Sequence, residues 1–231
     1  MKSDKVIERV ELTKDQAWIR GFNTSIYKHI LPYIKRRSIL DAGCGNGLFE
    51  VICLDLNIKK IDAFDISASA LLNARKLVEN KSSKIMFGRK DFNQEGFKKS
   101  AYDIAVSTEV IEHLTNYQFY LGNLYRALKQ GGKLFLSTPN KNVSPELNRY
   151  HVQEFSFQEM MTNLESANFK VIKTYGIAPN NLSNFVTKFV SGWVIYLVKK
   201  LPGYEWLISR FFQFKTSSPE NSSTILYVAK K

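Results

Sequence analysis

The sequence is poor in the features that mark secreted and membrane-spanning proteins. Only two cysteines, Cys44 and Cys53, occur in 231 residues, and Cys44 lies in a glycine-rich turn where a disulfide would be strained. The most apolar stretch, residues 189–198, is about half as long as the ~20 residues that a helix needs to cross a bilayer. Residues 1–16 contain no apolar core of the kind found in secretory signals. We therefore expect a cytoplasmic protein.

Acidic residues are also scarce relative to basic ones. The chain has 33 Lys and Arg against 21 Asp and Glu, which gives a formal net charge of +12. This charge favours anionic surroundings such as phosphates, nucleic acid or acidic lipid headgroups, without choosing among them. Because no RNA-binding module or arginine-rich tract is recognisable, nucleic acid is the less favoured partner.

Apolar runs rich in β-branched residues alternate with segments of helical periodicity along most of the chain. Seven runs predict strands, at residues 37–43, 60–66, 84–91, 102–108, 132–139, 169–177 and 224–231. Such alternation is typical of βαβ units that build a parallel sheet. The length of 231 residues and the 44% of hydrophobic residues fit one α/β domain with a single large core.

The strongest local signal is a glycine-rich turn after the first predicted strand. It reads Asp41-Ala42-Gly43-Cys44-Gly45-Asn46-Gly47, with three glycines at alternate positions. Glycine permits positive φ angles and lets a ligand touch the backbone. A dinucleotide fingerprint would place its third glycine at position 48, where this chain has leucine, so that interpretation is disfavoured.

This turn resembles the first motif of the class I S-adenosylmethionine methyltransferases, which has the form acidic-x-Gly-x-Gly-x-Gly. Similar family-like features recur in order at Asp65, at Asp91-Phe92, and within residues 102–114 and 128–140, so that the resemblance covers roughly residues 36–175. It implies a Rossmann-like, mostly parallel sheet of seven strands with helices on both faces and an antiparallel last strand. It also implies S-adenosylmethionine as cofactor.

The resemblance assigns a role to each part of the cofactor site. Asp65 would accept from the ribose diol, Asp91 from the adenine amino group, and Phe92 would lie against the adenine ring. The glycine turn would lie under the methionine portion, and Asp41 would organise its ammonium. Asp65 or Asp91 alone would be as well explained as a turn or cap residue. The full cofactor site would consist of Asp41, Gly43, Gly45, Gly47, Asp65, Ile66, Asp91, Phe92 and Thr108.

Candidate catalytic residues follow the fourth predicted strand. If the segment is helical, Glu109, Glu112 and His113 share one face, where a carboxylate or an imidazole could deprotonate an acceptor. This Glu-x-x-Glu-His pattern with the later His151-x-x-x-Phe155 resembles the ubiquinone-pathway O-methyltransferases.

The same pattern also resembles the small-RNA terminal 2′-O-methyltransferases, in which two glutamates and two histidines hold a divalent metal. Those ligands would fall on Glu109, Glu112, His113 and His151, a mixed oxygen and nitrogen set that suits Mg²⁺, Mn²⁺ or Zn²⁺. The alternative is that the histidine is a general base or a structural helix residue, as in family members without a metal.

The resemblance and the periodicity together divide the chain into four parts of a single domain, residues 1–231. We expect an N-terminal helical cap at 1–36, a cofactor-binding core at 37–178, an amphipathic helical insertion at 179–221 and the last strand at 222–231. Within the insertion, residues 182–214 carry apolar residues at helical spacing, edged by Lys and Arg. They could lie on a membrane surface or bind a lipid-linked acceptor. The alternatives are packing on the sheet, a homodimer interface or a protein partner.

The sequence therefore predicts an S-adenosylmethionine-dependent methyltransferase, located in the cytoplasm or at the membrane surface. We expect O-methylation of a small hydrophobic or lipid-linked acceptor, such as a quinone-pathway intermediate or a glycan lipid. Oxygen is favoured only by the resemblance. The alternatives are an RNA 2′-O-methyltransferase and a non-catalytic cofactor-binding subunit.

Overall fold

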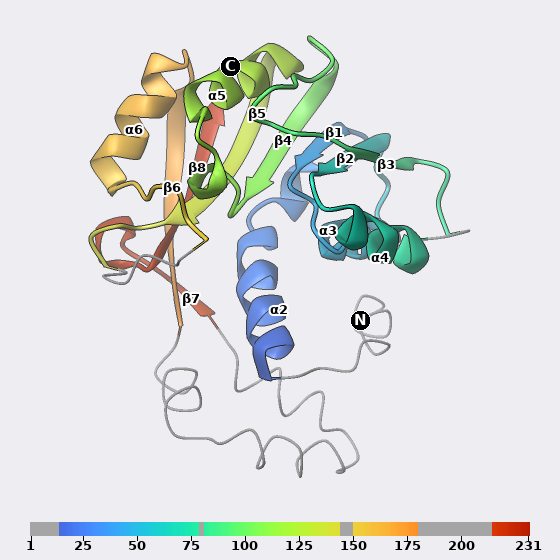
Figure 1. Cartoon of the computed structure of the whole chain (residues 1–231), viewed down its shortest axis with the longest axis horizontal. Helices are drawn as coiled ribbons and strands as arrows, with labels where there is room; N and C mark the ends of the chain where they lie inside the picture. Colours follow the sequence, from blue (N-terminus) through green and yellow to red (C-terminus); the bar gives the residue numbers. More distant parts are fainter. Residues whose placement is uncertain (1–13, 79–80, 144–149, 180–213) are drawn as a thin grey trace.

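The computed structural model describes residues 14–78, 81–143, 150–179 and 214–231. These residues form an eight-stranded sheet flanked by helices (Figure 1). The predicted cap residues 1–13 and most of the predicted insertion, residues 180–213, lie outside the described residues. In chain order the elements are α2 (Lys14–Tyr27), η2 (Leu31–Tyr33), β1 (Ser38–Ala42), α3 (Leu48–Cys53), β2 (Lys60–Asp65), α4 (Ala68–Val78), β3 (Ile85–Arg89), β4 (Tyr102–Thr108), η3 (Ile111–His113), α5 (Tyr117–Ala127), β5 (Leu128–Pro139), α6 (Phe157–Ser166), β6 (Lys170–Pro179), β7 (Phe214–Ser217), η4 (Pro219–Asn221) and β8 (Thr224–Lys230).

The strand order is β3-β2-β1-β4-β5-β8-β6-β7. Strands β1 to β5 pair in parallel, with Asp41 of β1 opposite Ala63 of β2 and Val106 of β4. The last strand, β8, pairs antiparallel with both β5 and β6. The predicted Rossmann-like, mostly parallel sheet with an antiparallel last strand is confirmed.

The sheet has eight strands rather than the seven that the sequence predicts. The additional strand, β7, pairs antiparallel with the end of β6 and lies at the edge of the sheet. Its first residue, Phe214, is the last residue of an aromatic stretch that we interpreted as helical. Its ring instead packs edge-on against Phe22 of α2 at a centroid distance of 5.4 Å. Tertiary packing therefore outweighs the local helical pattern here.

Helices cover both faces of the sheet, because alternate strand residues point to opposite sides. Leu40 belongs to a buried cluster with residues of α5 and α6, whereas its neighbour Ile39 belongs to a second cluster with residues of α2, α3 and α4. Figure 1 shows α5 and α6 over one part of the sheet and α2, α3 and α4 around the other. This two-layered core fixes the strand ends that carry the candidate site.

Successive strands β1, β2 and β3 are added toward one edge of the sheet, whereas β4 and β5 are added toward the other edge. The switch point lies between the neighbouring strands β1 and β4. In open α/β sheets, ligands bind at the carboxyl ends of the strands next to such a switch point. Among the described residues, no helix combines the length and the apolar character needed to cross a membrane.

Candidate active site

The glycine turn follows β1 at the switch point and requires glycine for two different reasons. Gly43, Gly45 and Gly47 all have positive φ angles, of 98°, 51° and 81°. A side-chain carbon at position 43 would lie 2.1 Å from Cγ2 of Val110, so that the backbone passes directly against the loop after β4. A carbon at position 45 would meet no atom within 4 Å. Gly43 thus packs directly against the protein, whereas there is free space beside Gly45.

Asp65, at the end of β2, is tied to this turn. Its Oδ2 accepts a hydrogen bond from the backbone N–H of Gly45 at 2.9 Å, and its Oδ1 accepts from the N–H of Ser67 at 2.8 Å. The next residue, Ile66, exposes 54% of its surface. One carboxylate therefore holds the β1 and β2 loops together beside an exposed apolar side chain.

Asp91 and Phe92, predicted to contact adenine, have structural partners of their own. Oδ1 of Asp91 accepts from the N–H of Asn93, and its Oδ2 accepts from the amide of Gln94, both at 2.9 Å. Phe92 is only 5% exposed and its ring stacks on Tyr120 at a centroid distance of 5.3 Å. The turn role and the core packing are observed, and contact with adenine stays a prediction.

A buried polar group lies under the glycine turn. Burial raises the pKa of Asp41 to about 7, and its side chain is 2% exposed. Tyr27 of α2 lies against it and hydrogen bonds to Thr108 at the end of β4. Glu50, a residue that we did not predict, contacts Asp41 from the first turn of α3. The one signal for Glu50 in the sequence is a lone acid in the apolar helix LFEVIC.

The loop after β4 differs from the helix that we predicted there. Only Ile111–His113 are helical, as a single 3-10 turn, and Glu109 has a left-handed φ of 54°. Glu109 accepts a hydrogen bond from Oγ of Ser137 at 2.8 Å. A non-glycine residue in this region costs about 1–2 kcal/mol, and such strain is typical of functional sites.

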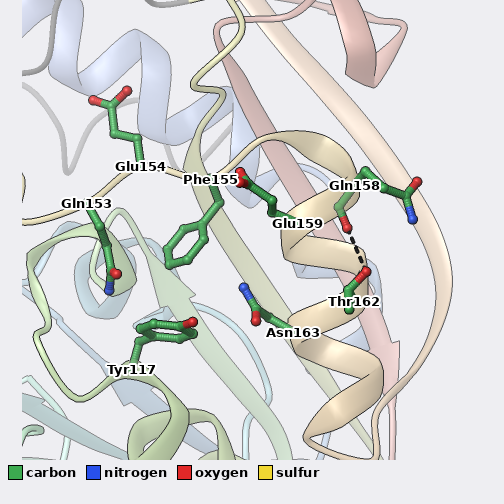
Figure 2. Close-up of a pocket in the computed structure, with 8 residues that line it drawn as sticks. All are labelled: Tyr117, Gln153, Glu154, Phe155, Gln158, Glu159, Thr162 and Asn163. Atoms are coloured by element: carbon green, nitrogen blue, oxygen red, sulfur yellow. Dashed lines mark hydrogen bonds between the residues drawn. The ribbon is translucent and has the colours of Figure 1, made fainter.

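A cavity of about 460 Å³ lies beyond this loop, between the start of α5 and α6 (Figure 2). Phe155 points into it in Figure 2, whereas Glu154 points away from it. Because none of the glycine-turn residues line it, this cavity is not the candidate cofactor site. Its lining consists of Tyr117, Gln153, Glu154, Phe155, Gln158, Glu159, Thr162 and Asn163.

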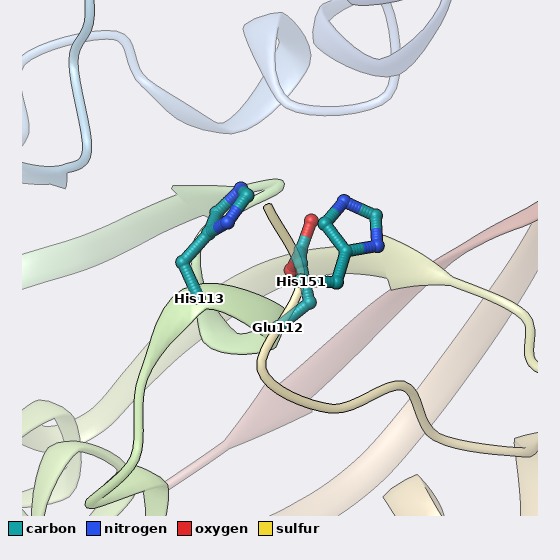
Figure 3. Close-up of side chains that lie close together, drawn as sticks. All are labelled: Glu112, His113 and His151. Atoms are coloured by element: carbon teal, nitrogen blue, oxygen red, sulfur yellow. The ribbon is translucent and has the colours of Figure 1, made fainter. Parts of the chain in front are cut away.

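Three of the four predicted catalytic and metal-ligating residues meet on the other side of residues 151–155. Figure 3 shows the imidazoles of His113 and His151 beside the carboxyl group of Glu112, with a ligand atom of each residue within 4.8 Å of the others. The two rings lie edge to face with centroids 5.0 Å apart. Glu109 does not join them, since it faces Ser137. Three of the four predicted metal ligands therefore lie together in this structure.

Both histidines use the same ring nitrogen to contact the protein. Nδ1 of His113 lies 2.9 Å from the backbone carbonyl of Tyr150, and Nδ1 of His151 lies 2.6 Å from Oε1 of Glu154. Since a carbonyl or a carboxylate can only accept, each Nδ1 is the donor, and each Nε2 is the ring nitrogen that could take a proton or bind a metal. We did not predict Glu154, although it follows His151 by three residues in the sequence.

Burial sets the charge state of the two carboxyl groups in this region. It raises the pKa of Glu109 to about 7, and burial together with the nearby Glu109 raises the pKa of Glu112 well above its usual range. Glu112 also accepts a hydrogen bond from Oγ1 of Thr138 at 3.2 Å. Two adjacent carboxyl groups of raised pKa are typical of functional sites.

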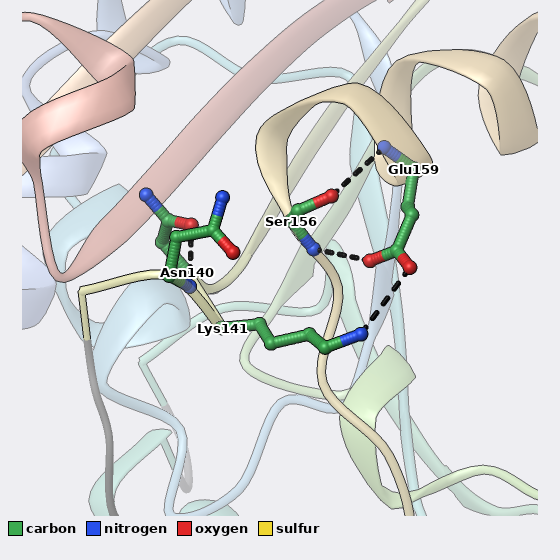
Figure 4. Close-up of polar contacts among 5 residues, drawn as sticks. Asn140, Lys141, Ser156 and Glu159 are labelled. Atoms are coloured by element: carbon green, nitrogen blue, oxygen red, sulfur yellow. Dashed lines mark hydrogen bonds and ion pairs between the residues drawn. The ribbon is translucent and has the colours of Figure 1, made fainter.

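The segment that carries His151 is held at both ends. The N–H groups of Val152 and Gln153 donate to the carbonyl of Glu112 at 2.9 and 3.2 Å. Ser156 begins α6 with a capping box, in which its side chain accepts from the N–H of Glu159 and the Glu159 carboxylate accepts from the N–H of Ser156 (Figure 4). Lys141, which follows β5, pairs with Glu159 at 3.3 Å. These contacts anchor the residues directly after His151 to η3 and to the start of α6.

A parallel sheet with a glycine turn at its switch point and an acid at the end of β2 defines the class of proteins that bind a nucleoside-containing ligand at this edge. The family model of the methyltransferase domain matches residues 16–174. The chain therefore belongs to the family of methyltransferase domains.

Two curated relatives have similar sequences. A probable S-adenosylmethionine-dependent methyltransferase of Mycolicibacterium smegmatis is 25% identical over 171 residues, which are 72% of this chain and 64% of that protein. The ubiquinone biosynthesis O-methyltransferase of Coxiella burnetii is 30% identical over 114 residues, 49% of this chain and 48% of that protein. In both cases the match spans less than two thirds of the relative's length.

Solved structures share the fold at low sequence identity. The S-adenosylmethionine-dependent methyltransferase of Mesorhizobium loti superimposes with a TM-score of 0.65 at 16% identity, covering 91% of this chain and 100% of that chain. The cyclase SpnF superimposes with a TM-score of 0.63 at 14% identity, covering 96% and 84%. One fold thus carries different reactions, and the acceptor has to be argued from the site.

Proposed function

We propose that this methyltransferase transfers the methyl group to a hydroxyl oxygen of a small hydrophobic or lipid-linked acceptor. The observation that carries the proposal is the pair of imidazoles beside the carboxyl end of β4, whose Nδ1 atoms are bonded to the protein and whose Nε2 atoms could therefore act on an acceptor. The likeness to the Coxiella burnetii enzyme, named for ubiquinone biosynthesis, supports oxygen as the acceptor atom.

The residues around the glycine turn fit the methyl donor. The open side of Gly45 suits the methionine portion and the diol of the ribose suits Asp65, whose oxygens keep one lone pair each. The exposed Ile66 offers an apolar surface to the adenine. Asp41, whose Oδ1 is buried without a hydrogen-bond donor among the described residues, suits the ammonium. The donor supplies an electrophilic methyl group on a sulfonium.

Replacing Asp65 with asparagine is expected to weaken donor binding about 10–100-fold. The amide can accept at only one of its two polar atoms, so that either the Gly45 N–H or the diol loses a charge-assisted bond, each worth about 1.5–3 kcal/mol. Calorimetric titration with S-adenosylhomocysteine measures the effect. Asp62→Asn, on the same strand but bonded to Tyr102, is the matched control and keeps the wild-type affinity. Equal losses in both variants would remove the diol role of Asp65.

On the acceptor side, methyl transfer needs an aligned oxygen and a group that takes its proton. The Nε2 atom of His151 or His113 accepts that proton. Glu154 and the Tyr150 carbonyl hold the opposite ring nitrogens and stabilise the imidazolium that forms, as acceptors of its Nδ1–H. The chain thereby supplies a base whose orientation is already set.

A divalent cation is the second candidate for the same ring nitrogens. The specific observation is that Glu112, His113 and His151 offer one oxygen and two nitrogens within 4.8 Å of one another. Histidine ligands of metals almost always bond to a carbonyl or carboxylate through the other nitrogen, as both do here. Bound Mg²⁺, Mn²⁺ or Zn²⁺ would lower the pKa of the acceptor hydroxyl.

Chelation separates the two modes. Protein dialysed against EDTA and then freed of the chelator keeps its transfer rate if the imidazoles act as bases alone, which is the outcome we expect. A loss of more than tenfold, restored by one of the three cations, would assign these nitrogens to a metal. The metal content of the purified protein, measured by mass spectrometry, accompanies the rates.

The acceptor class is tested by incubating the purified protein with methyl-labelled S-adenosylmethionine and a cell extract. Label is then counted in organic-soluble, aqueous small-molecule, RNA and protein fractions. We expect label in the organic-soluble fraction that resists mild base, as a methyl ether formed on a hydroxyl oxygen does, whereas release of the label as methanol would identify a methyl ester. Label in RNA alone would contradict the proposal and assign the chain to the RNA 2′-O-methyltransferases. Donor binding without label in any fraction would indicate the non-catalytic subunit.

The predicted membrane contact through residues 182–214 and the predicted homodimer belong to this proposal as well. Nearly all of that segment lies outside the described residues, and its predicted apolar faces with flanking lysines come from the sequence alone. We propose that the segment binds the apolar part of the acceptor at the membrane surface. Flotation with vesicles of anionic lipid is the expected result, and protein that stays at the bottom of the gradient would contradict it.

A further inference from the structure

Asp41 and Glu50 form a carboxyl pair on either side of the glycine turn. Asp41 belongs to β1, directly before the turn, and Glu50 belongs to the first turn of α3, directly after it. The two side chains contact each other, and they are 2% and 0% exposed. Among the described residues, no donor reaches Oδ1 of Asp41 or either carboxyl oxygen of Glu50. Such burial is rare for an acid that has no partner.

Two buried carboxyl groups in contact cannot both be ionised without a large electrostatic cost. Burial raises the pKa of Asp41 to about 7 and moves the pKa of Glu50 well above its usual range. The free protein therefore keeps one proton between the two groups, which makes a donor of one of them and explains how the pair tolerates its surroundings.

Among the described residues, the titratable groups that act on the pair include no cation that could replace this proton. All of them are neutral or acidic. They are Tyr27 of α2, Cys44 of the glycine turn, Cys53 of α3, Asp65 of β2 and Tyr120 of α5. A ligand with a compact positive charge and several N–H donors would satisfy the three carboxyl oxygens that lack a donor.

We propose that Glu50 is the second carboxylate of the site for the donor's ammonium group, and that binding of the donor expels the proton that Glu50 shares with Asp41. This inference rests on the proposed function, in which the amino acid end of the donor lies at the glycine turn. The pair changes from one negative charge to two, the ammonium keeps its three hydrogens, and the proton leaves to solvent.

The proton is counted by titrating the full chain with S-adenosylhomocysteine in buffers of different ionisation enthalpy, between pH 7 and 7.5. The amino group of the ligand is mostly protonated there. We expect release of about one proton, and a donor affinity that rises close to tenfold per pH unit, because the ligand competes with the proton. The matched ligand is 5′-methylthioadenosine, which lacks the amino acid end and should release none.

Glu50→Gln supplies the matched variant, since an amide has the size of the acid but cannot lose the proton. It is expected to bind S-adenosylhomocysteine about tenfold more weakly, with a flat pH profile, and to bind 5′-methylthioadenosine as the wild type does. Equal proton release by both ligands, or none by S-adenosylhomocysteine, would overturn the inference without any variant. If neither ligand binds, the proposed donor site fails instead.

Discussion

Replacing His151 with alanine is expected to lower the rate of methyl transfer about 10²–10³-fold, while the affinity for S-adenosylhomocysteine changes less than twofold. The Nε2 atom of His151 is one of the two candidate base nitrogens beside the carboxyl end of β4. The contact of its Nδ1 with Glu154 orients the ring. The side chain lies on the acceptor side and does not belong to the glycine turn. Initial rates of label incorporation into the organic-soluble fraction measure the effect.

His29→Ala is the control for this experiment. His29 is the third histidine of the chain, and its ring stacks on Tyr175 at a centroid distance of 3.9 Å, away from the cluster. The His29→Ala variant should retain the wild-type rate of methyl transfer. A His151→Ala protein with full transfer activity would show that the Nε2 atom of His151 serves neither as the base nor as a metal ligand.

The second large effect is expected at the glycine turn, where two alanine substitutions should fail in opposite ways. Gly43→Ala brings a methyl group to 2.1 Å from Val110 at a φ of 98°. Overpacking and left-handed strain together cost about 3–5 kcal/mol of the free energy of unfolding. Urea denaturation should show this loss, or the variant should not accumulate as folded protein.

Gly45→Ala has no protein atom within 4 Å of the new carbon and only the strain of a positive φ, about 1–2 kcal/mol. It should fold, yet bind S-adenosylhomocysteine at least 100-fold more weakly, because the methyl group occupies the open side of the turn. Calorimetric titration gives the affinity and urea denaturation gives the stability. A Gly45→Ala protein of wild-type affinity would show that the donor does not lie against this turn.

Much of the fold could be predicted because buried strands have a clear pattern. The runs at β1, β2 and β4 are apolar and end in polar residues or glycine, and the structure places them as predicted. β7 could not be predicted in the same way. Its residues follow an aromatic stretch, and their pairing depends on the exposed edge of β6, which no local pattern records.

The geometry of the glycine turn was predictable because its glycines and Asp65 serve the local backbone, and local geometry leaves a signature in the sequence. The arrangement after β4 was not. A helical spacing placed Glu109 on the same face as Glu112 and His113, but the left-handed backbone at Glu109 breaks that spacing.

Contacts between residues that only the tertiary structure brings together could not be predicted from the sequence. Glu50 meets Asp41 only because α3 packs under the glycine turn, and Phe92 is drawn into the core by Tyr120. The contact of Glu154 with His151 depends on how the backbone of Val152 and Gln153 docks on Glu112.

A crystal structure of the protein with S-adenosylhomocysteine tests the account most directly. We expect the ribose diol on Asp65, the adenine against Ile66, and the ammonium within hydrogen-bond distance of both Asp41 and Glu50. We also expect the sulfur to face the Nε2 atoms of His113 and His151 across the space for the acceptor. A ligand bound away from the glycine turn, or a sulfur turned away from both histidines, would contradict it.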